Sequence, residues 1–565
     1  MPRVHHTRTS RRWHRAIPAL LAAALLATGV SCGGSSGAGS SGGDQVLKVG
    51  TVAAIDSLNP FVAIDAQAYN IFVMEYPQLV QYGPGVKIEG DYAENWTHSK
   101  DGLVWTFHLH PGGKWSDGKP LTAEDVAWTG NTVLKYGSGP TALLASSLDG
   151  VKDFKATDDN TVVVTYKRPV APVLANLEQF FILPEHIWSQ YTANNGKDLK
   201  AFFPEKHLPV VAGGAYSVTK YESKGVTVLK PNPGFYGPKS HAAAVTLSFY
   251  TNATSMIEDL ANGVLDYVDQ VPFTAADAVK KHDNLTLNVG PGSEVTNLII
   301  NSNPLKTKNR ELLDPKVKEA LEYAIPREQI VEVVFGGYAK PWANILSEYS
   351  KGDGWLNPDV QPLPYDIDKA NEILDGLGYT RGSDGIRVAP ADNGQPTHPM
   401  KYSIIVPGDL DFSGDRQFEI LQQSFAKIGI NVSEVAGGDV NQAYSLITAP
   451  NYKYLNADMA TWYWHPYVDP NFNLSVVTKA QWGNYSDTGF DDPKYDAWWS
   501  QQSKMIDQKQ RQALVWKMEA YLADQRPYIQ LVQGAVITAW GPRFTGFEPQ
   551  LSGYCKCYYT SPRPT

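Results

Sequence analysis

Two tryptophans placed two positions apart are the residues whose types and spacing best suit solute binding. Trp462 and Trp464 lie in the aromatic run from Thr461 to His465, and side chains two positions apart point to the same face of a strand. Two indole rings on one face would offer large apolar surfaces with one N–H donor each. From these residues alone, the favoured interpretation is a strand whose aromatic side chains fill a core.

Other reactive side chains lack the spacing of a catalytic site. The chain has 58 acidic residues, enough to include the carboxylate pair of a secreted carbohydrate-active hydrolase, but no spacing singles out such a pair. It contains no H-E-x-x-H and no P-loop. His108 and His110 would share one strand face, but no third metal ligand of suitable spacing is evident. We therefore expect no catalytic residue, no metal and no cofactor, with the hydrolase as an alternative.

The elements around residues 93–128 follow one another clearly. Apolar side chains alternate with polar ones from Trp105 to Leu109, which predicts a strand with one buried face. The turn residues Pro111 to Gly113 end it. Thr122 and Asp125 have the spacing of a capping box, in which the hydroxyl and the carboxylate each accept a backbone N–H. A helix should follow.

Strands and helices interleave along the rest of the chain, which favours mixed α/β lobes. Period-two runs predict strands over Leu47–Val52, Val104–His110, Thr161–Tyr166, Gly225–Lys230, Val245–Tyr250 and Thr296–Asn301. Periodicity near 3.6 predicts helices over Pro315–Tyr323, Ile367–Leu377, Arg416–Ile428 and Lys509–Gln525. A chain of 565 residues is too long for one core, because single cores stop growing at about 250–300 residues.

The first 31 residues are typical of an export signal. Five arginines and no acid accompany the apolar run Ala16–Val30, which is too short to span a hydrocarbon layer of about 30 Å as a helix. Ser31 and Cys32 then precede a Gly/Ser tract, as in a bacterial lipoprotein whose lipid is attached to Cys32. Residues 32–43 would form a flexible tether. The alternative is an ordinary signal peptide and a freely secreted protein.

Net charge and cysteine content limit the partners and the covalent links that we expect for this chain. Loss of residues 1–31 removes five of 49 basic residues and none of 58 acidic ones, which leaves a net charge of −14. Phosphate binding needs the opposite sign, so nucleic acid is not an expected partner. Apart from Cys32, only Cys555 and Cys557 occur. They could pair with each other, bind metal or remain unpaired, and we favour a disulfide without metal.

Several motifs resemble one family, the peptide-type extracellular solute-binding proteins of ABC importers. The run W-S-D-G-K-P-L-T-A-E-D-V from Trp115 to Val126 is similar to the family's signature. Further segments match its motifs in order: Gly213–Tyr216, Lys230–Tyr236, Asn262–Asp266, Asp314–Ile325, and Asn484–Ser486 through Tyr495, Asp496, Asp507, Arg511 and Asp524–Pro527. The resemblance covers nearly all of the mature chain.

The resemblance implies an α/β, two-lobe periplasmic-binding-protein-like fold of the hinged class II type, with an extra subdomain inserted in lobe I. Carried over to this chain, lobe I would comprise residues 44–90, 208–295 and 530–565. The inserted subdomain would be 91–207, and lobe II would be 296–529. The chain would cross between the lobes twice.

The resemblance also implies a solute in the cleft between the lobes, in some members an extended peptide added as a strand. The expected binding residues are Asp65, Gln67, Tyr69, Asn70, Asn297, Trp462, Tyr463, Trp464, His465, Asp469 and Asn484. Peptide-binding members hold the α-amino group with an aspartate where this chain has Pro466. Asp65 or Asp469 would then be a substitute anchor, and an oligosaccharide, a glycoside or a blocked peptide is an alternative solute.

The function implied is that of a monomeric lipoprotein on the outer face of the cytoplasmic membrane. It would capture an oligopeptide and deliver it to a membrane permease powered by separate ATPase subunits, without breaking bonds. A signalling receptor that passes its ligand to a sensor kinase would have the same sequence features.

Overall fold

The computed structural model describes residues 45–63, 65–83, 86–391, 395–408, 414–547 and 561–565. The predicted export signal, Cys32 and the tether lie outside the described residues. So do Cys555 and Cys557.

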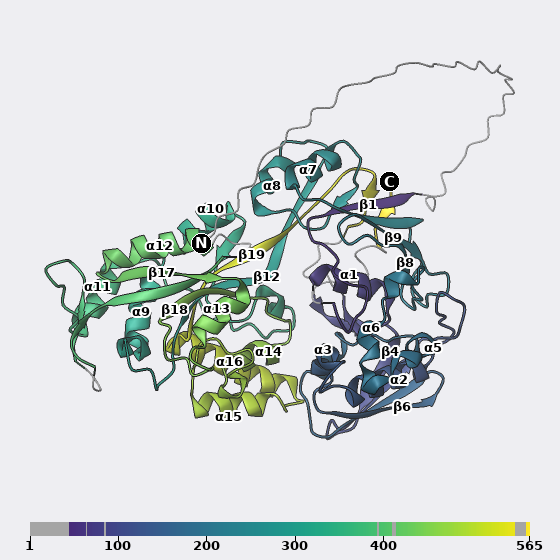
Figure 1. Cartoon of the computed structure of the whole chain (residues 1–565), viewed down its shortest axis with the longest axis horizontal. Helices are drawn as coiled ribbons and strands as arrows, with labels where there is room; N and C mark the ends of the chain where they lie inside the picture. Colours follow the sequence, from purple (N-terminus) through teal and green to yellow (C-terminus); the bar gives the residue numbers. More distant parts are fainter. Residues whose placement is uncertain (1–44, 64, 84–85, 392–394, 409–413, 548–560) are drawn as a thin grey trace, which may run out of the picture. The chain divides into compact units, whose positions relative to one another are not determined.

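A large mixed sheet runs through the described chain (Figure 1). Its strand order is β17-β16-β18-β12-β19-β11-β1-β10-β9-β8, and β13 pairs with β19 in addition. The strands are β1 (Val46–Thr51), β8 (Tyr216–Lys220), β9 (Val226–Pro231), β10 (Ala244–Phe249), β11 (Tyr267–Val268), β12 (Thr286–Ile300), β13 (Ala339–Pro341), β16 (Lys401–Pro407), β17 (Asn431–Gly438), β18 (Met459–Trp464) and β19 (Tyr528–Trp540). Parallel and antiparallel pairs both occur, as in the predicted α/β class.

The long strands β12 and β19 join the two halves of this sheet. They pair antiparallel, and the register shifts between Pro291 and Val295 of β12. Gly292 lies in this irregular stretch, where a Cβ would come within 2.2 Å of the backbone oxygen of Gly534. Only glycine allows such a close approach of two backbones.

A separate four-stranded sheet of order β4-β5-β7-β6 lies between β3 and β8 in the chain. Its strands are β4 (Ala93–His98), β5 (Val104–Leu109), β6 (Val151–Asp158) and β7 (Thr161–Tyr166). Helix α2 (Ala123–Lys135) begins at Thr122 with both halves of the predicted capping box present. The strand, the turn and the capped helix expected over residues 93–128 are therefore confirmed.

The remaining helices cover the sheets and enclose several apolar cores. In the first half of the chain they are α1 (Ala66–Glu75), α3 (Ala142–Ala145), α4 (Val173–Leu177), α5 (Glu185–Trp188), α6 (Asp198–Ala201), α7 (Ala253–Ala261) and α8 (Phe273–Val279). In the second half they are α9 (Pro315–Tyr323), α10 (Arg327–Phe335), α11 (Ile367–Gly376), α12 (Gly414–Lys427), α13 (Val440–Ile447), α14 (Asn471–Ser475), α15 (Pro493–Gln502) and α16 (Gln508–Gln525). Small two-stranded ladders complete the described part, namely β2 (Val80–Tyr82) with β3 (Ile88–Gly90), β14 (Val388–Ala389) with β15 (His398–Pro399), and β20 (Phe544–Thr545) with β21 (Arg563–Pro564).

Candidate functional site

The aromatic run predicted to bind solute forms strand β18, and one edge of its second half is open. β18 pairs with β12 along its whole length, from Met459 to Trp464. On its other side β16 pairs only with Met459 and Ala460. Among the described residues no strand pairs with this side of the chain from Thr461 onwards.

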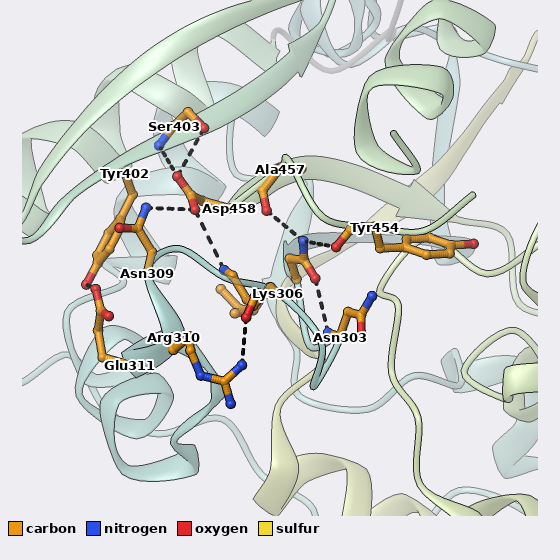
Figure 2. Close-up of polar contacts among 12 residues, drawn as sticks. Asn303, Lys306, Asn309, Arg310, Glu311, Tyr402, Ser403, Tyr454, Ala457 and Asp458 are labelled. Carbon is orange, nitrogen blue, oxygen red and sulfur yellow. Dashed lines mark hydrogen bonds and ion pairs between the residues drawn. The ribbon is translucent and has the colours of Figure 1, made fainter. Parts of the chain in front are cut away.

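A polar network fixes the beginning of β18 (Figure 2). Asp458 precedes the strand and accepts hydrogen bonds from the backbone N and the Oγ of Ser403, at 3.1 and 3.2 Å, and from Nδ2 of Asn309 at 2.8 Å. The ammonium of Lys306 lies 3.7 Å from the same carboxylate. Burial lowers the pKa of Lys306, although the Asp458 charge opposes this. The network ties β16, β18 and the loop after β12 together.

The two tryptophans of β18 have different surroundings. Trp462 is only 8% exposed and belongs to an apolar core with Ile299 and Leu474. Trp464 is partly exposed, and its Nε1 donates a hydrogen bond to the hydroxyl of Tyr528 at 3.2 Å. The interpretation of an aromatic core strand therefore holds for Trp462, whereas Trp464 keeps a face that a solute can reach.

The polar chain continues beyond Trp464. The hydroxyl of Tyr528 donates to the carboxylate of Asp487. Burial raises the pKa of Asp487 to about 7, although its hydrogen bonds favour the charged form. This buried carboxyl makes no ion pair with a described residue, so it is protonated in part near neutral pH.

Tyr463 and His465 are neighbours on the opposite face of this segment. Their ring centroids are 5.2 Å apart in an edge-on arrangement. The side chain of His465 is 59% exposed, and its Nε2 lies 3.9 Å from a carboxylate oxygen of Glu294. Desolvation by the surrounding protein lowers the pKa of His465 to about 4. The imidazole is therefore neutral and can both donate and accept a hydrogen bond.

Asp469 is engaged in a buried ion pair. Its two carboxylate oxygens accept from Nη1 and Nη2 of Arg511, each at 2.6 Å, and Oδ1 also accepts from the backbone N of Asn471 at 2.9 Å. The guanidinium lies 4.7 Å from the ring centroid of Trp355. Asp469 is thus paired already with Arg511 and with the backbone of the first residue of α14, which leaves little capacity for a solute ammonium.

The four residues predicted near α1 form two groups. Asp65 is exposed at the helix N-cap, and burial together with the Asp56 charge raises its pKa. Gln67 is buried; its Nε2 donates to Asp269 at 3.1 Å, and its Oε1 accepts from Asn70 at 3.0 Å. Burial raises the pKa of Asp269 to about 6. Gln67 and Asn70 are therefore bonded within the protein.

Tyr69 faces the segment after β18. Its ring centroid lies 5.6 Å from that of Phe72 and 6.0 Å from that of Phe181. Burial, and next the phenol of Tyr467, raise the pKa of Tyr69 to about 12. Tyr69 and Tyr467 are therefore close enough to interact, although one follows β1 and the other follows β18.

Asn297 and Asn484 have opposite environments. Asn297 is 1% exposed and pairs with Trp462 across the sheet, and neither N nor O of its side-chain amide has a hydrogen-bond partner in the described part of the chain. Asn484 is exposed, and its backbone oxygen accepts from the hydroxyl of Tyr444 at 2.8 Å. The residues predicted to bind solute are thus partly exposed and partly interior.

Sequence reasoning missed several residues beside this site. Tyr467 and Tyr485 are about half exposed and pack edge-on against Phe472, with centroid distances of 5.2 and 5.1 Å. Glu178, at the end of α4, is buried and electrostatically coupled to Tyr467. An acid inside the apolar run Val173–Leu183 was a signal that could have drawn attention to it.

Metal-binding clusters and membrane-spanning helices are both absent from the described residues. They contain no group of three or more histidine, cysteine, aspartate or glutamate side chains arranged to hold a metal ion. None of the described helices combines the length and the apolar character needed to cross a membrane.

Comparison with known proteins gives a consistent result. The model of bacterial extracellular solute-binding proteins, family 5 Middle, matches residues 87–484. The probable D,D-dipeptide-binding periplasmic protein of Escherichia coli (strain K12) is 24% identical over 63% of this chain and 66% of its own length. Heme-binding protein A of Haemophilus influenzae is 24% identical over 90% of this chain and 91% of its own.

The fold agrees with this match. The oligopeptide-binding protein AppA from Bacillus subtilis, solved in complex with a nonapeptide, superposes with a TM-score of 0.70 at 20% identity, over 93% of this chain and 100% of that one. At this identity the likeness establishes the fold alone, which is the two-lobe periplasmic-binding-protein fold expected from the sequence. The family match covers most of the sequence, and the chain therefore belongs to the bacterial extracellular solute-binding proteins, family 5.

Proposed function

We propose that this protein binds an oligopeptide along the open edge of β18 and delivers it to the permease of an ABC importer. One observation carries the proposal. From Thr461 to Trp464 the strand is held by β12 on one side and has no described strand on the other. An extended peptide satisfies its own backbone donors and acceptors by adding to such an edge.

The side chains around this edge suit a peptide as well. Trp464 offers a partly exposed indole, and Tyr463 and His465 offer polar groups on the opposite face. Successive side chains of a bound strand would therefore meet different surroundings on the two faces of β18. Main-chain hydrogen bonds would give affinity, and these surroundings would give side-chain preference.

The names of related proteins support a peptide without requiring one. Relatives include a probable D,D-dipeptide-binding protein and a solved oligopeptide-binding protein, but also a heme-binding protein. An oligosaccharide or glycoside is the second candidate, because the exposed face of Trp464 could also stack on a sugar ring. The two candidates differ in whether main-chain N–H groups of the solute are needed.

Matched peptides distinguish these candidates. The purified protein would be heated with a panel of di- to decapeptides and of oligosaccharides, since a ligand at 100 times its Kd stabilises by about 2.7 kcal/mol. For each active peptide, a variant N-methylated at alternate residues keeps the side chains but loses half of the backbone donors. We expect the methylated peptide to lose binding. Equal binding of both forms would reject strand addition, and a shift with oligosaccharides alone would favour the second candidate.

The proposal also includes export of the protein, a lipid anchor on Cys32 and binding of the solute without chemical change. Cys32 would carry the lipid and residues 33–43 would form the tether, so the body would stand outside the membrane. Mass spectrometry of the membrane-bound protein should find an acylated Cys32, and Cys32→Ser should release the protein from the membrane fraction. A recovered solute should have an unchanged mass; a hydrolysed solute would favour the alternative of a secreted hydrolase.

A further inference from the structure

Glu178 is a buried carboxylate without a counter-ion among the described residues. It is 2% exposed and follows the last residue of α4. One carboxylate oxygen accepts from Nε2 of Gln179 at 3.1 Å, and Glu178 makes no ion pair with any described residue. Burial raises its pKa to about 7, and the Gln179 hydrogen bond only partly offsets this. Removal of a carboxylate from water costs several kcal/mol when no cation compensates it.

The position of Glu178 is fixed beside the predicted solute site. The backbone oxygen of Glu178 accepts from the side chain of Gln78, just before β2. At the other end of β2, Tyr82 packs against Val86, Tyr349 and Val468, so that this strand reaches the segment after β18.

Contacts and electrostatic coupling connect Glu178 with aromatic residues beside the predicted solute site. Burial, and next the charge of Glu178, raise the pKa values of Tyr82 and Tyr467. Both tyrosines belong to the surroundings of the segment that follows β18. The ring of Tyr69 also packs against Phe181, three residues after Glu178, at a centroid distance of 6.0 Å, which places the end of α4 beside the predicted solute site.

Tyrosine rings belong to the surroundings of this predicted site as well. Tyr467 is 47% exposed although protein surrounds it closely enough to raise its pKa by desolvation. Its phenol also interacts with that of Tyr69. An electron-rich ring face attracts a cation within about 6 Å, by roughly 0.5–2 kcal/mol. A carboxylate together with tyrosine rings is therefore a combination that favours an organic cation.

We propose that Glu178 is the counter-ion for a positively charged group of the solute, an ammonium or a guanidinium that lies between this carboxylate and the rings of Tyr69 and Tyr467. The inference rests on the proposed function, because it assigns a chemical group to the solute of the same site. Among the described residues, only the hydrogen bond from Gln179 offsets the desolvation of this carboxylate. A bound cation compensates it through a charge-assisted hydrogen bond.

The test compares probes that differ in charge but hardly in shape. Trialanine amide would be compared with N-acetyl-trialanine amide, and Nα-acetyl-L-arginine amide with Nα-acetyl-L-citrulline amide, by calorimetric titration and by melting temperature. A hydrogen bond between charged groups contributes about 1.5–3 kcal/mol, which corresponds to about 10- to 100-fold in affinity. We expect each cationic probe to bind more tightly than its neutral counterpart by about this factor.

Variants show whether Glu178 is the cause. Glu178→Gln keeps the shape of the side chain and its bond to Gln179, and should abolish the preference for the cationic probes without lowering the stability of the free protein. Asp353→Asn is the matched control, because Asp353 is another partly buried acid whose charge reaches Tyr82; it should retain most of the preference.

The outcomes separate this inference from the proposed function. Retention of the full preference in Glu178→Gln would overturn the inference and leave the peptide function intact. Binding of the neutral probes alone by the unaltered protein would also overturn the inference and leave the peptide function intact. If no peptide of either charge binds, the peptide function fails and the assignment of a cationic group fails with it.

Discussion

Trp462 and Trp464 are identical in type and two positions apart, and yet they differ in what they contact. The strand geometry places both on one face, as expected, but the depth of each along β18 decides its role. Trp462 packs into the core with Ile299 and Leu474, whereas Trp464 is partly exposed and bonds to Tyr528. The periodicity of a sequence gives the face of a side chain and not its depth.

Substitution by alanine should therefore separate the two residues. Trp462→Ala should lower the free energy of unfolding by about 3–5 kcal/mol, because it leaves a cavity in a packed core. Trp464→Ala should lower it by clearly less and should weaken peptide binding at least about tenfold through loss of the exposed ring. Urea unfolding and calorimetric titration measure the two effects. Equal stability losses in both variants would mean that Trp464 is also a core residue.

The ion pair of Asp469 and Arg511 gives a second prediction at the residue scale. Asp469→Asn should lower the free energy of unfolding by about 3–5 kcal/mol, because it leaves a buried guanidinium without its partner. Glu372→Gln is the control, since the pair of Glu372 with Lys369 is exposed on α11 and such pairs contribute about 0–1 kcal/mol. Chemical denaturation provides the values. Unchanged stability with lost binding would show instead that Asp469 anchors the solute.

Residue roles were the least predictable part of the site. The sequence motif drew attention to the segment around Trp462, but it could not show that Asp469 is bonded to Arg511, which lies far away in the chain. It also gave no indication that the Asn297 amide is buried without partners. Such facts depend on which distant segments meet, and local patterns contain no information on that.

At the scale of elements, local sequence signals predicted several helices well but not the full length of β12. The capping box at Thr122 and Asp125 was predicted and is present. The helix expected over Pro315–Tyr323 has these bounds, and the one expected from Arg416 begins two residues earlier, at Gly414. Strand β12 was predicted only from Thr296 onwards, because Gly290, Pro291 and Gly292 are typical of a turn. Pairing with β19 extends the strand through these residues, so tertiary contacts override the local preference there.

The cap offers a direct test of a predicted element. Thr122→Ala removes the hydroxyl that accepts from the backbone N of Glu124 and should lower the free energy of unfolding by about 1 kcal/mol. Thr122→Ser should retain most of the stability because serine caps equally well. Thr97→Ala, an exposed position on β4, is the control for loss of a threonine. A Thr122→Ser variant as unstable as Thr122→Ala would show that the threonine methyl group, rather than the hydroxyl, stabilises the helix.

At the scale of the whole molecule, the two halves of the sheet are connected through β12 and β19, whose backbones approach closely at Gly292 and Gly534. Direct contacts also link segments far apart in sequence, such as the hydrogen bond of 2.9 Å from the backbone N of Ala171 to the oxygen of Ser503. If the proposed solute touches both halves, it should stabilise the arrangement in which these contacts form relative to one in which they are broken. The stabilisation equals the difference in the solute's contact energy between these two arrangements.

Buried carboxyls distributed over the molecule should make its stability depend on pH. Burial raises the pKa of Glu75 to about 8, and lesser shifts in the same direction affect Asp269, with a pKa of about 6, and Asp487, with a pKa of about 7. A carboxyl whose folded-state pKa is raised favours the folded state fully below its unfolded pKa, and this stability is lost as the pH rises through the folded-state value. Lys318, with a pKa lowered to about 7 by burial, is protonated in both states below that pH and does not alter the slope there.

We therefore expect the free energy of unfolding to fall as the pH rises from about 5 to about 7, the range in which Lys318 stays protonated in both states, and Glu75→Gln to remove part of the fall. At about 1.4 kcal/mol for each pKa unit, the part that belongs to Glu75 is on the order of 3 kcal/mol. Glutamine keeps the oxygen that accepts from the backbone N of Val218, so the fold should tolerate the change. Glu419→Gln, at an exposed position on α12, should leave the slope unchanged. Urea unfolding at several pH values would decide, because a slope that is identical in the unaltered protein and in Glu75→Gln would mean that Glu75 has an ordinary pKa and is solvated despite its position.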